Sequence, residues 1–257
     1  MITEIYNGYV KVEKHNWVTT IEFSHPQGNS LPGKILEELA KEFHSAGYDD
    51  ETRVIVLRSA GDRGFCGGAS FDELTLIQNK EQGIHFFSGF AHVINAMRKC
   101  PQFIVARVHG KCVGGGVGLV AAADYAIAAE GAEVKLSELA LGFGPFIVGA
   151  AIERKIGISA FSQLAIDAAL WRNADWARRK GLYAELHETV EGMDESLERL
   201  TGNLSRYNPQ AMAEMKKMFW RGTENWDQLL IERAGISGRL VLSDFTKQAI
   251  GKFKSKP

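Results

Sequence analysis

The segment HGKCVGGGVGLVAAADYAIAAEGAEVKLSEL, residues 109–139, decides the fold. Its three adjacent glycines, Gly114–Gly116, follow a strand predicted at Phe103–Val108 and precede a helix predicted from about Leu119 to Ala123. Residues without a Cβ let the backbone approach a ligand closely, and the first N–H groups of a helix favour negative charge. The segment therefore indicates either a tight strand-to-helix turn or a site for an oxyanion or a phosphate.

A dinucleotide site fits the same glycines poorly. The fingerprint GxGxxG starting at Gly114 would need a glycine where Leu119 stands, and only the looser GxGxxA fits, through Gly116, Gly118 and Ala121. A phosphate-binding GxxxxGK[ST] motif is absent from the sequence. These spacings argue against a nicotinamide enzyme.

Outward from this segment, strands and helices alternate. Apolar patterning predicts strands at Tyr9–Glu13, Val18–Phe23, Val54–Leu57 and Tyr125–Ala128, and helices at Ile35–Phe43 and Gly83–Met97. From about residue 193 onward the pattern is helical, with helices predicted at Asp194–Ser205, Pro209–Arg221, Trp226–Gly238 and Asp244–Phe253. We therefore expect an α/β core over residues 1–193 and a helical region over 194–257.

The composition excludes several classes of protein. The 257 residues carry a formal net charge of -1, which argues against nonspecific electrostatic binding to nucleic acid or to an anionic membrane. The three cysteines show no CxxC spacing, which is typical of reduced thiols. Neither a signal peptide nor an apolar run long enough to span a bilayer is apparent, so we expect a cytoplasmic protein.

A second loop points to the same chemistry as the glycine run. The sequence RGFCGGASFDEL, residues 63–74, is another strand-to-helix junction with small residues before a polar helix start. Two such loops can each direct one N–H group at a single oxygen, as an oxyanion hole requires.

The two loops together resemble the crotonase (enoyl-CoA hydratase/isomerase) superfamily. FCGGASFDEL resembles its FCAGADLKEM-type loop, and residues 109–139 resemble its NGxAxGGGxELAxxCDxxxAxxxAxFxxPE block. HPQGNSL at 25–31 and the tail from YNPQAM to SDFTKQAIGKFKSK also match family elements. The resemblance implies a spiral of ββα units with two roughly perpendicular sheets, a C-terminal helical trimerisation region, and assembly as a homotrimer or dimer of trimers.

The resemblance also implies the site. The backbone N–H groups of Ala69 and Gly115 would bind the oxygen of an acyl-CoA thioester, and Glu138 would move the proton. We expect further substrate contacts from loop residues, namely Gly68, Ser70, Gly114, Gly116, Gly118 and Phe146. CoA would enter as part of the substrate, and neither a metal nor another cofactor is implied.

The reaction depends on how many carboxylates serve it. The family's hydratases usually carry two glutamates, but here Gly118 occupies the first position and only Glu138 remains. One carboxylate is enough to move a proton from C2 to C4, so we expect 3-enoyl to 2-enoyl-CoA isomerisation. An enoyl-CoA or methylglutaconyl-CoA hydratase stays open, because Asp72 or Glu73 on the adjacent loop could replace the missing acid. A non-catalytic acyl-CoA-binding homologue is a further alternative.

The sequence contains other reactive side chains, for which we expect no catalytic or metal-binding role. Ser70 and Cys66 lack the GxSxG elbow and an evident His/Asp partner pattern, which argues against covalent catalysis. His85 and His92 lie seven residues apart on a predicted helix, without further metal-ligating residues at suitable spacing. We expect them to be partly buried, hydrogen-bonded histidines rather than metal ligands.

Overall fold

Two β-sheets organise the chain. In this computed structural model, which describes residues 7–254 and side chains as far as Lys252, the larger sheet has the order β1-β2-β3-β5-β7-β9. Only β1 is antiparallel to its neighbour. Its strands are β1 (Tyr9–His15), β2 (Val18–Ser24), β3 (Val54–Ser59), β5 (Phe103–Val108), β7 (Tyr125–Ala129) and β9 (Glu185–His187). The smaller sheet is parallel, with β6 (Lys111–Val113) between β4 (Gly64–Cys66) and β8 (Val134–Lys135).

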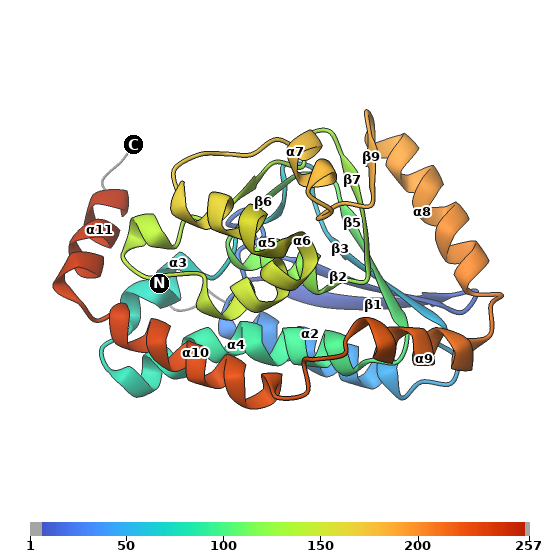
Figure 1. The fold of residues 1–257 in the computed structure, drawn as a ribbon, viewed down its shortest axis with the longest axis horizontal. Helices are drawn as coiled ribbons and strands as arrows, with labels where there is room; N and C mark the ends of the chain where they lie inside the picture. Colours follow the sequence, from blue (N-terminus) through green and yellow to red (C-terminus); the bar gives the residue numbers. More distant parts are fainter. Residues whose placement is uncertain (1–6, 255–257) are drawn as a thin grey trace.

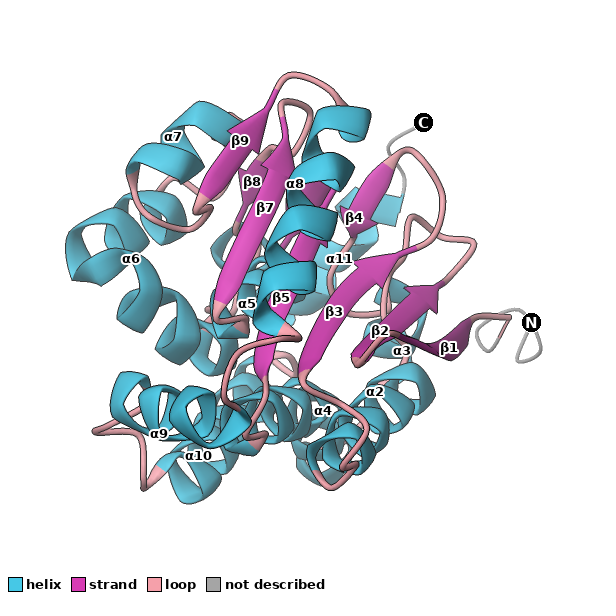
Figure 2. Cartoon of the chain, turned by 90° about the vertical axis from the view of Figure 1, so that its right-hand side faces the viewer, coloured by secondary structure: helices cyan, strands magenta, loops and turns pink. Residues whose placement is uncertain are grey.

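The helices surround these sheets (Figures 1 and 2). They are α2 (Gly33–Gly47), α3 (Phe71–Leu76), α4 (Lys80–Lys99), α5 (Gly115–Ala122), η1 (Leu139–Leu141), α6 (Phe146–Ile166), α7 (Ala174–Arg179), α8 (Val190–Leu204), α9 (Pro209–Phe219), α10 (Trp226–Leu240) and α11 (Asp244–Lys254). The predicted α/β class with a helical C-terminal region is confirmed. The sequence-based boundary between residues 193 and 194 falls inside α8.

Side-chain alternation in the central strands explains why both faces of the larger sheet are covered. In β3, Ile55 and Leu57 join the main core, whereas Val54 joins a second cluster that includes Val105 and Met193. Met193 belongs to α8, which lies across the outer face of the sheet in Figure 2. Because successive side chains of a strand point to opposite faces, the same strands contribute apolar residues to two hydrophobic cores.

Three helices differ from the sequence-based expectation, among them the short α7, which was not predicted. Helix α5 begins at Gly115, four residues before the predicted start, because the glycines of its first turn are buried against neighbouring side chains. Helix α6 was not predicted, because buried apolar residues occupy every position from Ile147 to Ile152 and leave no amphipathic pattern. Gly157, with a φ of 75°, then interrupts it.

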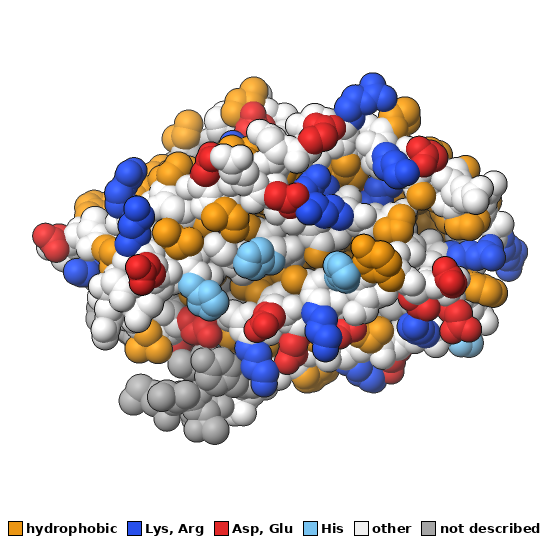
Figure 3. Space-filling view, turned by 90° about the horizontal axis from the view of Figure 1, so that it is seen from below, with side chains coloured by type: hydrophobic (Ala, Val, Ile, Leu, Met, Phe, Trp, Pro, Cys, Tyr) orange, Lys and Arg blue, Asp and Glu red, His pale blue; other side chains and the backbone are white. Residues whose placement is uncertain are grey.

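Helices α2, α4 and α10 pack side by side beneath the sheets (Figure 1). Helices α4 and α10 cross where a Cβ on Gly83 would lie 2.7 Å from the Cα of Gly238, so their backbones are in direct contact. Figure 3 shows acidic and basic side chains interspersed over this face of the molecule, without a patch of one sign. Within residues 7–254, helices that could cross a bilayer are not found.

Candidate active site

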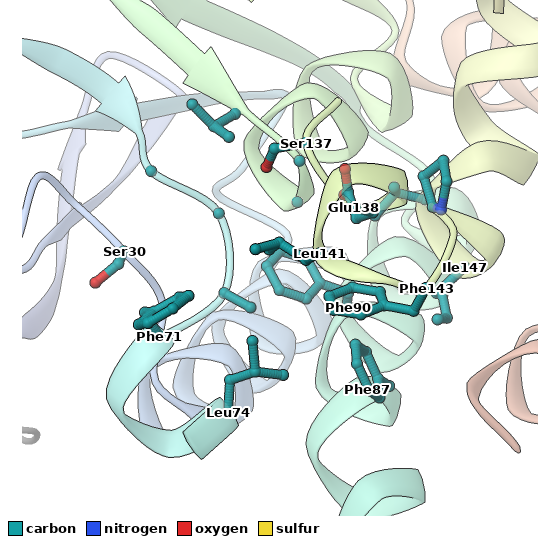
Figure 4. Close-up of a pocket in the computed structure, with 18 of the residues that line it drawn as sticks. Ser30, Phe71, Leu74, Phe87, Phe90, Ser137, Glu138, Leu141, Phe143 and Ile147 are labelled. Carbon is teal, nitrogen blue, oxygen red and sulfur yellow. The ribbon is translucent and has the colours of Figure 1, made fainter. Parts of the chain in front are cut away.

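A cavity of about 370 Å³ lies where the two glycine-containing loops meet (Figure 4). Its walls come from the segment 27–30, the loop 67–69, helices α3 and α4, the segment 113–115, and the stretch from Ser137 to Val148. The predicted residues Gly68, Ala69, Gly114, Gly115, Glu138 and Phe146 all line it. Residues far apart in the sequence are therefore brought to one space.

The backbone around Ala69 leaves its N–H group available. Leu31 forms an isolated parallel bridge with Ala69, in which Leu31 N donates to Gly68 O at 2.8 Å and Ser70 N donates to Leu31 O at 3.1 Å. In a parallel bridge of this kind the N–H of the middle residue points away from the bonded strand. Gly68 adopts a φ of +88°, which glycine allows without steric cost. The Ala69 N–H is thus directed away from Leu31 at the wall of the cavity.

The second N–H group is that of Gly115, at the start of α5. The first N–H groups of a helix have no intrahelical acceptor, so this donor is free for a ligand oxygen. A Cβ on Gly68 would lie 3.5 Å from Gly115 N, which places the two loops in contact. A Cβ on Gly115 itself would lie 2.1 Å from the ring of Phe90. Only glycine fits there.

Glu138 follows β8 and stands beside both loops. Its carbonyl accepts hydrogen bonds from Leu141 N at 3.1 Å and Phe143 N at 3.2 Å, which fix the turn that carries it. A Cβ on Gly114 would lie 2.7 Å from Glu138 Oε1, so the carboxylate rests on the glycine run. The residue keeps some surface toward the cavity, but Oε2 is buried and has no hydrogen-bond partner.

Burial changes the acidity of this carboxyl group. Loss of solvation raises the pKa of Glu138 to about 7, against a lowering contribution from its own backbone N–H. A carboxyl group with a pKa near neutrality is present in both its ionised and its protonated form at pH 7. It can therefore take up a proton and return it.

Three of the expected substrate contacts lie outside the cavity wall. Ser70 is fully buried and caps α3, where its hydroxyl accepts from Glu73 N at 3.3 Å. Gly116 packs against Cys66, and Gly118 packs against Val148, whose Cβ would lie 2.5 Å from a Cβ at 118. Gly116 and Gly118 therefore pack into the protein interior, outside the cavity wall.

The acids on the adjacent loop do not reach the cavity either. Asp72 accepts a hydrogen bond from Gln27 Nε2 at 2.8 Å, and Glu73 accepts from Gly33 N, at the start of α2, at 2.8 Å. The two bonds tie α3 to the first residue of α2 and to the segment before it. Neither carboxylate lines the cavity, so neither supplies a second acid beside Glu138.

The remaining reactive side chains have structural positions. Cys66 is fully buried and its pKa is raised to about 12 by desolvation, so it is a neutral thiol. His85 and His92 are both exposed on α4, so the expectation that they would be partly buried was wrong. Groups of His, Cys, Asp and Glu able to hold a metal ion are not found among the residues that the structure describes.

Some cavity residues were not predicted. Phe71 and Leu74 come from α3, Leu141 from η1, and Ile147 and Val148 from the first turn of α6. The i, i+3 spacing of Phe71 and Leu74 after the first loop was a usable signal. For Ile147 and Val148, which belong to a helix that was not predicted, the sequence offered no usable signal.

The chain is similar to a family of known proteins along most of its length. The family model described as enoyl-CoA hydratase/isomerase matches residues 13–249. A Mycobacterium tuberculosis protein, named (7aS)-7a-methyl-1,5-dioxo-2,3,5,6,7,7a-hexahydro-1H-indene-carboxyl-CoA hydrolase, is 26% identical over 78% of this chain and 79% of its own. A probable enoyl-CoA hydratase of Bacillus subtilis is 26% identical over 93% of both chains.

A solved structure extends the likeness to the whole fold. The crystal structure of an enoyl-CoA hydratase from Bacillus halodurans superposes with a TM-score of 0.88 at 21% identity, over 95% of this chain and 99% of that one. Other relatives are named methylglutaconyl-CoA hydratase and Delta(3,5)-Delta(2,4)-dienoyl-CoA isomerase. The resemblance seen in the two loops is confirmed along the chain, which belongs to the enoyl-CoA hydratase/isomerase family, with the crotonase fold.

Proposed function

We propose that the protein is an enoyl-CoA isomerase that converts a 3-enoyl thioester into its 2-enoyl isomer. The observation that carries the proposal is the single carboxylate: among the described residues that line the cavity, Glu138 is the only ionisable side chain. Hydration commonly relies on a second acid to handle water. The second acid would be expected at position 118. That residue is Gly118, and Val148 occupies the space that a side chain there would need.

The reaction needs one base and one pair of oxyanion donors. The ionised Glu138 removes a proton from C2 of the 3-enoyl thioester, and the electron pair moves onto the thioester oxygen as a dienolate. The N–H groups of Ala69 and Gly115 donate to that oxygen, an interaction that strengthens as charge develops. The protonated Glu138 then gives its proton to C4, the double bond forms between C2 and C3, and the carboxylate is restored.

The test is turnover of hex-3-enoyl-CoA, followed by 2-enoyl absorbance and product mass, with Glu138→Gln alongside. We expect conversion without a change in mass, reduced at least about a thousandfold in the variant, which keeps the shape but loses the base. A product heavier by one water would favour hydration. Release of the free acid would favour a hydrolase.

Hydration is the second candidate, because the Bacillus subtilis relative that spans 93% of the chain is named a probable enoyl-CoA hydratase. It predicts that crotonyl-CoA gains water in the unmodified protein. Under the isomerase proposal, hydration requires two changes together. Val148→Gly opens the space, and Gly118→Glu fills it with a carboxylate, whereas Gly118→Glu alone meets Val148 and disturbs α5.

A further inference from the structure

The part of the cavity beyond the oxyanion donors has a hydrocarbon wall. Phe87 contacts Phe143 edge-to-face with ring centroids 5.3 Å apart, and Phe86 contacts Phe87 at 5.0 Å in the same manner. In Figure 4 the side chains of Phe87, Phe143 and Ile147 lie on the opposite side of the cavity from Ser30. Further apolar side chains line the same cavity, namely Phe90, Leu141, Phe146 and Val148, and Phe71 and Leu74 of α3 line the side nearer Ser30 (Figure 4).

Positive charge is missing from this wall. Of the described residues that line the cavity, none is Lys, Arg or His. Arg233 lies behind the wall, where its Nη1 donates to the carbonyl of Phe146 at 3.2 Å. A second carboxylate on a bound acyl group would therefore be buried without a partner and near Glu138. Burying an unpaired charge in this way costs several kcal/mol.

The volume limits the size of the occupant. A cavity of about 370 Å³ is at the small end of the range for ligand pockets. The thioester group takes part of this space, because the oxyanion donors line the same cavity. The remaining space is bounded by the rings of Phe87 and Phe143, so it suits an acyl chain of medium length rather than a long one.

We infer that this site selects thioesters of uncharged, medium-length hydrocarbon acids, and rejects acyl groups that are dicarboxylic or long. The inference rests on the acyl-CoA premise of the proposed function but not on the reaction itself. Apolar walls without a cation set the preference for charge, and the rings of Phe87 and Phe143 set the preference for size.

Saturated thioesters, which cannot isomerise, test the preference by direct binding. Titration calorimetry would compare octanoyl-CoA with suberyl-CoA, which has the same number of acyl carbons and a terminal carboxylate, and with palmitoyl-CoA. We expect octanoyl-CoA to bind at least about tenfold more tightly than either of the other two thioesters. A tenfold ratio corresponds to a difference in binding free energy of about 1.4 kcal/mol. Suberyl-CoA or palmitoyl-CoA binding as tightly as octanoyl-CoA overturns the inference.

A pair of variants tests the role of the aromatic wall. Phe87→Leu enlarges the cavity, and Phe43→Leu removes the same atoms from a buried residue of α2 outside the cavity wall. We expect Phe87→Leu to raise the affinity ratio of decanoyl-CoA to octanoyl-CoA at least about threefold, and Phe43→Leu to leave it unchanged. Equal ratios in both variants contradict the assignment.

The two proposals fail in different ways. If octanoyl-CoA binds preferentially but hex-3-enoyl-CoA is not isomerised, the proposed reaction is wrong and the inferred selectivity stands. If none of the thioesters binds, the acyl-CoA premise is wrong and the inferred selectivity falls with it.

Discussion

At the scale of single residues, the environment of Glu138 predicts a pH dependence of the rate. In the proposed reaction the group acts as a base only when it is ionised, and burial raises its pKa to about 7. We therefore expect kcat/KM for hex-3-enoyl-CoA to rise about tenfold per pH unit below pH 7 and to level off above about pH 8. The measurement is a rate profile between about pH 5 and 9. A flat profile below pH 7 would place the base on another group.

The same pKa predicts a stability cost at high pH. The carboxyl group has a higher pKa folded than unfolded, so the folded state binds more protons between the two values and loses stability as pH rises through them. The cost is absent below the ordinary pKa of about 4.5 and complete above about pH 8. Glu138→Gln removes it. We expect the variant to be more stable at pH 8 by on the order of 2 kcal/mol, a figure lowered for screening by cavity water.

Urea unfolding of both proteins at several pH values measures this difference. The stabilising effect of Glu138→Gln should shrink toward zero as pH falls to about 4.5. The exposed Glu188 provides the matched control, because Glu188→Gln removes the same charge at the surface. A constant difference across the pH range would mean that the variant acts through packing rather than through ionisation.

At the scale of elements, the proposed oxyanion donor at the start of α5 requires that this turn stays free of side chains. A methyl group at Gly115 would collide with the Phe90 ring, at 2.1 Å, so Gly115→Ala must displace either α4 or the first turn of α5. We expect a loss of about 10²–10³ in kcat, the usual effect of losing one oxyanion donor. Gly131→Ala is the control, because its new methyl group meets no atom within 4 Å. Similar kcat values for both variants would show that the Gly115 N–H does not contribute to catalysis.

The elements differ in how far the sequence predicts them. Strand β5 has the predicted bounds, Phe103–Val108, because a short apolar run between turn residues fits a buried parallel strand. The two glycine-containing loops and Glu138, which line one cavity, could be picked out from the sequence because they are local motifs. The contacts of Gly118 with Val148 and of Gly115 with Phe90 join segments 25 to 30 residues apart in the numbering, and only the packed fold creates them. Helix α6 was not predicted, because its apolar residues do not follow the period of an amphipathic helix.

At the scale of the whole molecule, one buried ion pair fastens the C-terminal helices to the core. Lys216 on α9 lies 2.9 Å from Asp124, and their side chains are only 2% and 7% exposed. Lys216 Nζ also donates to Gln102 O at 2.7 Å. Asp124 accepts further bonds from Ile104 N at 2.8 Å and from Trp220 Nε1 at 3.0 Å. One carboxylate thus joins the start of β5, the end of α5 and the end of α9.

Breaking this pair should destabilise the whole chain, because it leaves a buried charge without its partner. We expect Lys216→Met to lower the free energy of unfolding by about 3–5 kcal/mol in urea denaturation. The adjacent Lys217 pairs with Glu214 at the surface, so Lys217→Met should cost less than about 1 kcal/mol. Adding Asp124→Asn to Lys216→Met should recover part of the loss, since an amide needs no counter-charge and can still accept the bond from Ile104 N. Equal effects of the two lysine variants would show that the C-terminal helices are held by their apolar contacts alone.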